Sequence, residues 1–530
     1  MSYQVRPSRR KRRKAKPNSR GRLSVQKPNG IIGPRVQKVG GERFAIVCVD
    51  PAKHCSEWMM ADYFGNLLIE PQTLQHQGAF FKSAVKLIHE AQQAHDIQDT
   101  LVVVERTGNY YLAPKRAFAS AGFETRVLHP FATKQYRVPA DPGNKTDETD
   151  LYAQHRAAAA GFGLCEHELE SPYRELRLRV RHRRNLVEKA AALACQIREH
   201  LHLAMPGYAK LFDRIFERQG PLALAGCADS PAKLLELGQT GLVEHLRENK
   251  IRHQVRTVEK VLAWAAQAAS DDIQDGPLHH AIWKELYELY QHFRLQISVL
   301  ERELAGYLVN IPYVRLLAIP GINVVSAAEL AGEMGPIEHY ANANAITGRS
   351  GLYPSRYQSD GTDNDSGSII RQANRRLRCV LMRIAENLAC HCRYYRGQAD
   401  VDESRGVDKR ASRVKIVKRF SRLVIACVAG DEPMRHPCFQ QADSILEKLR
   451  KFHQEHHTSL DVVLAELEKA VDQLPYNTRS REAEIVAGVL QQQTSRSGVH
   501  AIGDLLPAVL ARLGINTESE KKTGIGPEPV

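Results

Sequence analysis

Four acidic residues in the first third of the chain are spaced so that they could share one reaction centre. Asp147 and Asp150 stand three residues apart in KTDETD, residues 145–150, which leads into a helix-forming run. Side chains three apart lie on one face of a helix, and two carboxylates there repel each other unless a cation lies between them. The simpler interpretation is that aspartates in a first helical turn only offset the helix dipole. Chemistry is favoured because Asp50 and Glu105 end two upstream strands.

Two continuous apolar segments precede this helix, and each ends in an acid. FAIVCVD over residues 44–50 and TLVVVE over residues 100–105 have the length and composition of strands buried on both faces. With their neighbours they predict the order β-β-β-α-β-α-β-α for the first 160 residues, a mixed sheet covered by helices. Ligands of such sheets bind at the carboxyl ends of strands. The sequence therefore predicts that all four acids gather at one edge of the sheet.

A cluster of four carboxylates is a site for hard divalent cations. These groups cannot all ionise in one pocket without positive charge, and oxygen ligands suit Mg²⁺ or Mn²⁺. Two such ions about 4 Å apart can clamp the attacking and leaving oxygens of a phosphoryl transfer. Taken singly, Asp50 could cap a turn and Glu105 could pair with Arg106. Lys145, in the loop before the helix, could contact a phosphate or remain in solvent.

The net charge of +14 is concentrated at the N-terminus. Residues 1–41 hold thirteen Lys and Arg and no Asp or Glu, so basic and acidic residues nearly balance in the remainder. We predict that this segment is a disordered basic tail that binds phosphate backbones. A solubility tail or a targeting signal is the alternative. Its densest run is Arg9, Arg10, Lys11, Arg12 and Arg13.

The composition indicates a cytoplasmic protein without a membrane partner. The hydrophobic fraction is 43%, but no apolar run approaches the roughly 20 residues that cross a bilayer. The basic N-terminus lacks the apolar segment of a secretory signal. The ten cysteines form no C-x-x-C pair, so we expect reduced thiols.

Long helices are predicted in the middle of the chain. Residues 172–204 form a very basic helical run, in which Arg181, Arg183 and Arg184 are expected to follow a nucleic-acid backbone. A solvated helix is the alternative. Apolar residues then recur in steps of four and three over residues 282–307, which is typical of a coiled-coil seam. A hairpin with the basic helix and a dimer contact would both satisfy this pattern.

A second candidate site follows at residues 313–378. The turn IPGI, residues 319–322, resembles a helix-hairpin-helix, in which Gly321 would let backbone N–H groups approach a phosphate. A loop rich in serine and glycine comes next. Arginines around the start of the following helix could neutralise phosphate charge near that loop: Arg371, Arg375, Arg376 and Arg378. Residues 435–475 predict further helices without chemistry, with His453, His456 and His457 on a solvated face.

The order of these motifs resembles a known family. VDxxK from Asp50, ExTGNYY from Glu105 and KTDxxD from Lys145 resemble the N-terminal DEDD, RuvC-like domain of insertion-sequence 110/1111 family transposases. A GL-x-P element at residues 351–354 and N-x-x-LR at residues 374–378 resemble the family's C-terminal domain of transposase-20 type. The resemblance implies that the four acids bind the metal, Mg²⁺ or Mn²⁺.

The resemblance also implies a serine nucleophile in the loop. The family serine is usually followed directly by glycine, and alignment to GL-x-P points to Ser359, although Asp360 intervenes before Gly361. Ser366 is the rival, with Ser355 and Ser368 behind it. A serine hydroxyl must be activated, which a metal held by the acids could do. Attack on a phosphodiester would give a serine–DNA link that conserves the bond energy for rejoining.

The expected fold class is α/β plus α: a RuvC/RNase H-like mixed sheet, a long helical coiled-coil middle and a mostly helical C-terminal domain. The expected parts are a disordered basic tail (1–41), a DEDD domain (42–165), a helical region (172–308), a serine domain (309–430) and a helical extension with a disordered end (435–530). As an insertion-sequence transposase of a bacterial cytoplasm, bound to the nucleoid through DNA, the protein would act on element ends and target DNA.

The resemblance further implies a guide RNA encoded by the element and a homo-oligomer as partners. Three other functions fit parts of the sequence. A Piv-type DNA invertase would share every motif, and a RuvC-like junction endonuclease would need the acids without the serine. A non-catalytic nucleic-acid-binding protein would need neither.

Overall fold

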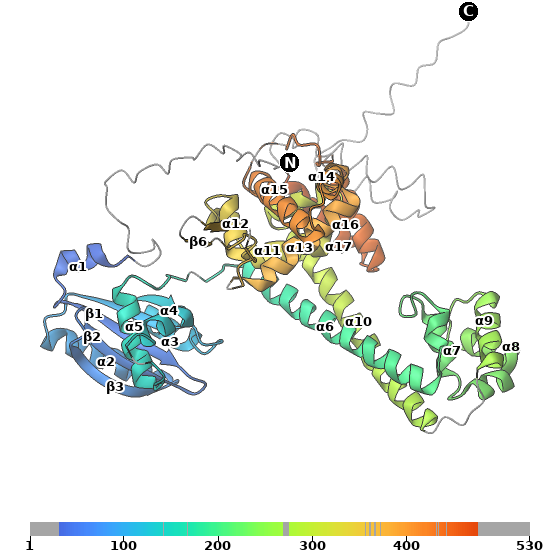
Figure 1. The fold of residues 1–530 in the computed structure, drawn as a ribbon, viewed down its shortest axis with the longest axis horizontal. Helices are drawn as coiled ribbons and strands as arrows, with labels where there is room; N and C mark the ends of the chain where they lie inside the picture. Colours follow the sequence, from blue (N-terminus) through green and yellow to red (C-terminus); the bar gives the residue numbers. More distant parts are fainter. Residues whose placement is uncertain are drawn as a thin grey trace, which may run out of the picture. The chain divides into compact units, whose positions relative to one another are not determined.

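The computed structural model describes residues 31–474, apart from residues 141, 167, 269–274, 356, 360–361, 365–366, 372, 431, 433 and 441–442. The chain divides into two compact units, Met1–Glu168 and Leu169–Val530 (Figure 1). The predictions for the basic run from Arg9 to Arg13 and for Ser366 lie outside the described residues.

The first unit is built around a five-stranded mixed sheet with the strand order β3-β2-β1-β4-β5. Strand β1 is antiparallel to β2 and parallel to β4, and β4 is parallel to β5. The elements are α1 (Gly33–Val39), β1 (Phe44–Pro51), β2 (Cys55–Asp62), β3 (Leu67–Gln75), α2 (Gly78–Ala94), β4 (Asp99–Glu105), α3 (Leu112–Ser120), β5 (Glu124–Leu128), α4 (Pro130–Arg137) and α5 (Asp147–Ala159). This RNase H-like arrangement confirms the predicted mixed sheet.

The alternation of side chains along β1 and β4 divides the domain core into two layers. Ala45, Val47 and Val49 pack on one face with side chains of α2 and α3. Phe44, Ile46 and Cys48 pack on the other face with side chains of α5. Strand side chains alternate with a period of two, so the central strands are apolar on both faces because helices cover both.

Two helices of this unit correct the sequence predictions. Helix α1 lies within the predicted tail, and Ile32 just before it is fully buried in the core beside α5. Arg35 fixes α1 to the sheet through ion pairs of 2.6 Å with Asp99 and 2.9 Å with Glu124. Helix α4 was not predicted, although Pro130 at its first turn is a helix-start signal.

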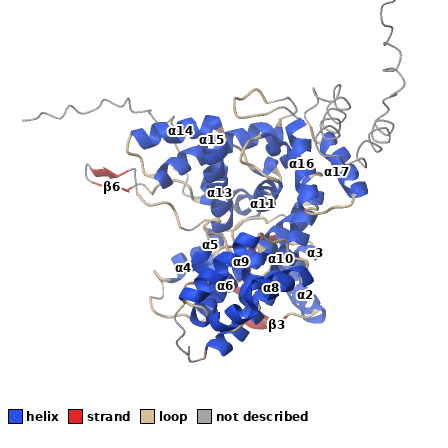
Figure 2. Ribbon diagram, turned by 90° about the vertical axis from the view of Figure 1, so that its right-hand side faces the viewer, coloured by secondary structure: helices blue, strands red, loops and turns tan. Residues whose placement is uncertain are grey.

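The described part of the second unit is mostly helical (Figure 2). Its first half contains α6 (Tyr173–Ala204), η1 (Tyr208–Leu211), α7 (Gln219–Gly226), α8 (Pro231–Glu248), α9 (Val255–Gln267) and α10 (Gly276–Leu308). Its second half contains η2 (Pro312–Ala318), α11 (Val324–Met334), η3 (Ile337–His339), α12 (Ala343–Ser350), β6 (Tyr357–Ser359), β7 (Thr362–Asn364), α13 (Arg375–His391), α14 (Arg393–Ser404), α15 (Lys409–Ala429), α16 (Asp443–Glu455) and α17 (Leu460–Asp472). Within the described residues, no helix is both long and apolar enough to cross a membrane.

Helices α6 and α10 lie side by side as an antiparallel hairpin within the chain (Figure 1). Of the two arrangements that the sequence left open, the structure contains the hairpin. Ile297 and Leu300 are buried against α6, as the seam predicted. Leu289 is 52% exposed, so the predicted seam is wrong there. At that end α10 packs with the end of α6 and with the bundle of α7, α8 and α9, which buries Trp283.

The C-terminal helices α16 and α17 belong to the main core of the second unit. Leu449 of α16 and Leu467 of α17 are buried in one cluster with side chains of α11, α13 and α15. The expectation that the histidines of this segment lie on a solvated face is wrong for His453, which is 1% exposed and faces Glu466 at 3.0 Å. His456 lies 3.3 Å from Glu301 of α10. The described part of the extension is therefore packed into the unit.

Candidate active site

Asp50 and Glu105 lie next to each other at one edge of the central sheet. Val49 of β1 pairs with Val104 of β4 in the parallel ladder, so the two acids are the next residues of adjacent strands. Adjacent strands lie about 4.8 Å apart. Both acids continue the set of side chains that faces α5, because Cys48 and Val103 belong to that layer.

The start of α5 brings the second pair of acids. Thr146 caps the helix by accepting a hydrogen bond from the backbone N–H of Thr149, whose hydroxyl in turn accepts from the N–H of Thr146. This capping box fixes where the helix begins. Asp147 is then its first residue and is exposed, whereas Asp150 lies one turn further along and is buried.

The pKa values show that the acids form one electrostatic cluster. The pKa of Asp50 is raised to about 7 by burial and by the carboxylates of Glu105, Asp150 and Asp147. Burial also raises the pKa of Glu105, with Asp150 adding to the effect. The Lys145 ammonium opposes both shifts. Asp50 therefore lies within electrostatic range of the other three acids and of Lys145, and the assignment of the four acids as metal ligands stays a prediction.

Two of the acids are held by neighbouring polar side chains. The Oε2 atom of Glu105 accepts hydrogen bonds from the Thr133 hydroxyl at 2.7 Å and from the Gln154 amide at 3.3 Å. Asp150 faces Arg137, with 3.1 Å between Oδ1 and Nε, and both side chains are largely buried.

The donor set fits a hard divalent cation, although the acids do not form a ready coordination shell. Among the residues that the structure describes, no three His, Cys, Asp or Glu side chains stand close enough together to hold a metal ion. The fit rests on a fully buried acceptor: Gln154 Oε1 has no hydrogen-bond partner beside Glu105. Clustered carboxylates with raised pKa values and a buried, unpaired amide oxygen both favour a cation or its hydration water.

Three residues of this site were missed by sequence reasoning. Gln154 follows Asp150 by four positions and Asp147 by seven, so helical spacing could have placed it on the same face of α5. Thr133 and Arg137 lie on α4, the helix that was not predicted from the sequence.

The predicted serine loop contains a short antiparallel hairpin of β6 and β7. Ser359 ends β6 and pairs with Thr362 of β7, and Asp360 and Gly361 lie outside the described residues. Ser355 and Ser368 lie at the base of the hairpin, where the N–H of Ser355 donates to the carbonyl of Ser368 at 2.9 Å. The choice of Ser359 over its rivals stays a prediction.

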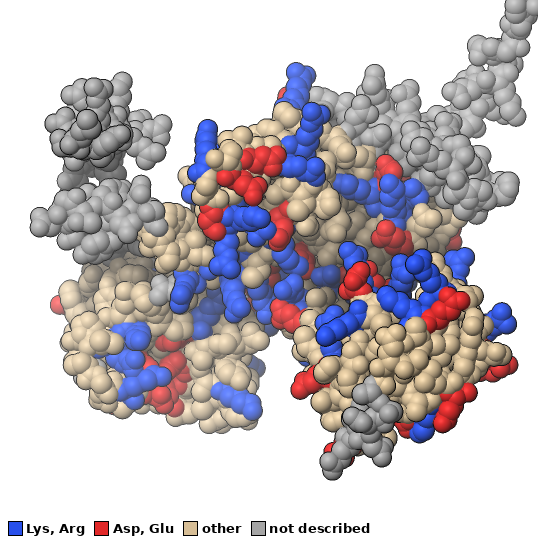
Figure 3. All heavy atoms as spheres, turned by 45° about the vertical axis from the view of Figure 1, so that its right-hand side comes forward, with Lys and Arg blue, Asp and Glu red and all other residues tan. Residues whose placement is uncertain are grey.

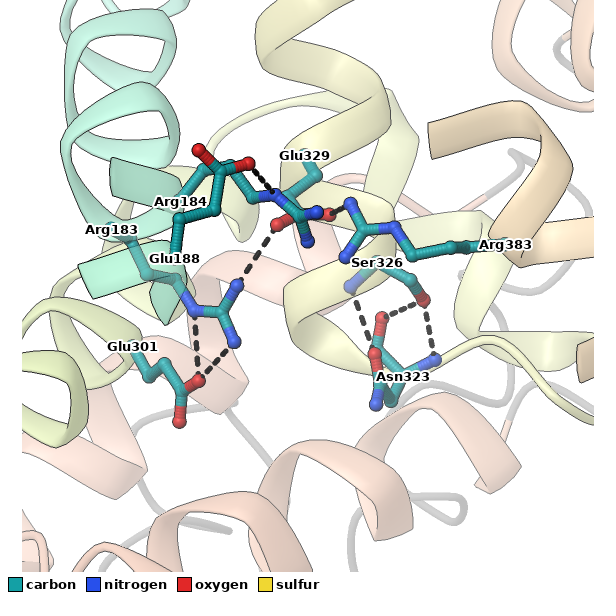
Figure 4. A network of polar contacts seen from close by, with 8 residues as sticks. All are labelled: Arg183, Arg184, Glu188, Glu301, Asn323, Ser326, Glu329 and Arg383. Atoms are coloured by element: carbon teal, nitrogen blue, oxygen red, sulfur yellow. Dashed lines mark hydrogen bonds and ion pairs between the residues drawn. The ribbon is translucent and has the colours of Figure 1, made fainter. Parts of the chain in front are cut away.

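Several arginines predicted to bind nucleic acid have carboxylate partners within the unit. Arg181 makes a bidentate pair with Glu333 at 2.8 and 2.9 Å. Arg183 bonds with Glu301 of α10 and donates to Glu329 of α11 at 2.9 Å (Figure 4). These contacts join α6 to α10 and α11, which gives Arg181 and Arg183 a structural role that sequence reasoning did not foresee. Arg184 pairs with Glu188 one turn along its own helix (Figure 4).

The arginines after the serine loop divide into two groups. Arg378 donates to the carbonyls of Ser350 and Ile370, so it braces the two ends of the loop. Arg371, Arg375 and Arg376 are exposed. A cavity of about 310 Å³ between α6, α11 and α13 has Arg184, Arg375 and Arg376 in its lining. Figure 3 shows many Lys and Arg side chains on the visible face, with Asp and Glu among them.

Two segments of the chain match known protein families. Residues 47–206 match the family DEDD_Tnp_IS110, described as Transposase. Residues 313–401 match Transposase_20, described as Transposase IS116/IS110/IS902 family. A Transposase for insertion sequence element IS1328 from Yersinia enterocolitica is 31% identical over 117 residues, which are 21% of this chain and 35% of that protein. The match thus spans about a third of the relative's length.

The two matches define the class of the protein as one with a DEDD domain followed by a Transposase_20 domain. The four acids lie in the first matched segment, and the serine hairpin and α13 lie in the second. Both matched segments are therefore similar to domains of the IS110 family of transposases.

Proposed function

We propose that the protein is the transposase of an insertion sequence, which cleaves and rejoins DNA through a serine–DNA link. The observation that carries this proposal is the gathering of Asp50, Glu105, Asp147 and Asp150 at one edge of an RNase H-like sheet, in a chain that also carries the second family domain. The substrates are the element ends and a target DNA.

The chemistry is divided between the two units. Ser359 Oγ attacks a phosphorus atom, a serine–phosphate ester forms, and one P–O bond to the neighbouring nucleotide breaks. The serine proton passes to a base at the acidic cluster, and the leaving nucleotide oxygen takes up a proton. When bound to the four acids, Mg²⁺ or Mn²⁺ supplies activation of the hydroxyl and polarisation of the phosphate. The two units must meet for this reaction, within one chain or across subunits of a homo-oligomer.

The basic residues supply the nucleic-acid contacts of this proposal. Arg371, Arg375 and Arg376 are exposed at the start of α13, directly after the serine loop, where guanidinium groups can neutralise phosphates. Arg181, Arg183 and Arg378 support the same region through contacts within the unit. An RNA encoded by the element is the further partner, and RNA that co-purifies with the protein and is lost on nuclease treatment together with target binding would support it.

A covalent-trapping assay tests the mechanism. The full-length protein is incubated with element-end DNA, total RNA from the element and Mg²⁺, and protein-linked DNA is sought on a denaturing gel. We expect a covalent species that is absent in Asp147→Ala and in Ser359→Ala and present in the matched control Ser368→Ala.

The other outcomes separate the alternatives. Loss of the covalent species in Ser366→Ala instead would move the nucleophile to Ser366. Metal-dependent cleavage without any covalent species would refute the serine mechanism and favour a RuvC-like endonuclease. Binding without cleavage under all conditions would favour a non-catalytic nucleic-acid-binding protein.

A further inference from the structure

The turn between η2 and α11 receives hydrogen bonds from a segment that lies beyond both family matches. Four backbone carbonyls of residues 317–322, which are the end of η2 and the turn after it, accept from residues more than a hundred positions further along the chain. The Lys448 ammonium of α16 donates to three of them, at 2.6, 2.8 and 3.0 Å, and the N–H of Gln440 donates to the fourth at 2.9 Å. In order, the four acceptors are Leu317, Ile319, Ile322 and Ala318.

The three contacts use the full donor capacity of the lysine. An ammonium group has three N–H donors, and here each donor faces one carbonyl of the turn. Burial lowers the pKa of Lys448 to about 8. A largely buried charge is stable only where polar partners surround it, and the carbonyl dipoles of the turn provide that surrounding.

The turn also lies against α13. Gly321 has a φ of +89°, and a Cβ atom built on it would lie 2.7 Å from the carbonyl oxygen of Asn387. Only glycine therefore lets the turn approach α13 this closely. The turn therefore contacts both the backbone of α13 and the lysine of α16.

The turn in its fixed conformation sets the start of α11. Asn323 caps this helix by accepting a hydrogen bond from the N–H of Ser326 at 2.8 Å, and the Ser326 hydroxyl accepts from the N–H of Asn323 (Figure 4). Helix α11 also carries Glu329 and Glu333, which join it to α6. The conformation of the turn therefore affects where α11 begins. Helix α11 in turn connects the serine domain with the α6–α10 hairpin.

We infer that Lys448 is a positioning residue of this transposase: its ammonium clamps the turn of residues 317–322, so that the C-terminal helices fix the element predicted to approach phosphate. The inference assigns α16 a role in DNA binding, and in that respect it rests on the proposed function. The clamp itself is a property of the folded chain and can be measured without nucleic acid.

Hydrogen–deuterium exchange of the full-length protein tests the clamp. Lys448→Met removes the charge and keeps the stem, and we expect exchange in residues 317–326 to become roughly tenfold to hundredfold faster. The matched control is Lys451→Met, because Lys451 lies on the same helix and is 58% exposed in a pair with Glu447. Peptides of β1 and β4 serve as an internal reference for global folding.

Chemical rescue separates a cationic clamp from simple packing. In Lys448→Ala, added n-propylammonium replaces the missing stem and charge, and we expect it to slow exchange of the turn, whereas n-propanol does not. Equal rescue by n-propanol would overturn the cationic role, and equal exchange in Lys448→Met and Lys451→Met would overturn the clamp.

DNA binding by the same variants completes the test. We expect Lys448→Met to bind element-end DNA at least about tenfold more weakly than Lys451→Met, since a turn that is no longer fixed must be ordered on binding. A faster-exchanging turn with unchanged DNA affinity would refute the role of the clamp in binding. If the wild-type protein binds no DNA while exchange still responds to Lys448→Met, the proposed function fails and the clamp stands.

Discussion

Replacing Asp50 with asparagine should change how the stability of the first unit depends on pH. Asp50 has a pKa raised from 3.8 to about 7 by burial and by three neighbouring carboxylates. An acid whose pKa is higher in the folded state binds more protons there than in the unfolded state. Its contribution to stability is therefore complete below about pH 4 and is lost as the pH rises through 7.

The size of this effect follows from the shift. A difference of about three pKa units corresponds to about 4 kcal/mol, which is an upper limit because Asp50 keeps part of its solvent exposure. Without metal, the wild-type unit should thus become less stable by up to about 4 kcal/mol between pH 4 and pH 7.5. An asparagine amide does not titrate in this range, so the Asp50→Asn variant should lack this part of the decrease.

Hydrogen exchange in the slowest amides of β1 and β4 is the suitable assay, because it reports the opening of the first unit separately from the second. Exchange is measured in EDTA across this pH range and corrected for the intrinsic pH dependence of amide exchange. The control is Glu90→Gln, an exposed acid on α2. Added Mg²⁺ should slow exchange in the wild type more at pH 7.5 than at pH 5, because protons compete with the cation.

One result would refute this reasoning. If wild type and Asp50→Asn lose the same stability between pH 4 and pH 7.5 in EDTA, the acids do not form an interacting cluster in solution. The assignment of the metal site to this edge of the sheet would then lose its electrostatic support.

Three further substitutions test the contacts around both sites. Thr133→Val removes a hydrogen bond to Glu105 at nearly constant volume, and we expect Mg²⁺ affinity measured by calorimetry to fall roughly 10- to 100-fold. Arg137→Gln leaves the buried carboxylate of Asp150 unpaired, which should destabilise the unit by about 3 kcal/mol in EDTA, with Mg²⁺ restoring part of the loss in thermal unfolding. Gly321→Ala forces a Cβ atom against the backbone of α13, and the second unit should lose about 2 kcal/mol or more in denaturant unfolding.

Two of these substitutions have matched controls. Lys134→Gln changes an exposed basic residue in the same turn of α4, and it should leave stability in EDTA unchanged. Gly348→Ala adds a Cβ atom on α12 that meets no atom within 4 Å, so it should be neutral or stabilising. Unchanged Mg²⁺ affinity in Thr133→Val would show that Glu105 does not need this hydrogen bond to bind the cation.

Local sequence patterns predicted the first unit well. Continuous apolar runs ending in Asp50 and Glu105 marked the central strands, because a strand covered by helices on both faces must be apolar at every position. Alternation along the same strands also determines that both acids face α5. Helix α4 was missed because its single turn signal, His129-Pro130, is followed by few apolar residues at helical spacing.

The dipeptide Asp360-Gly361 in the serine loop is open to two interpretations. Asp360-Gly361 departs from the family pattern of serine followed by glycine, yet Asp-Gly is also a favoured connection for two paired strands. Ser359 pairs with Thr362 in the structure, and residues 360–361 themselves lie outside the described residues.

The sequence by itself determined the strands, the capped start of α5 and the acids that these elements carry, since each depends on neighbours along the chain. Only the tertiary structure decided the partners of the arginines and of Lys448. Arg183 meets Glu301 and Glu329, and Lys448 meets the turn near Gly321, across separations of more than a hundred residues. The sequence alone does not show whether a charged side chain faces solvent, a phosphate or a carboxylate. Its partner depends on how the helices pack.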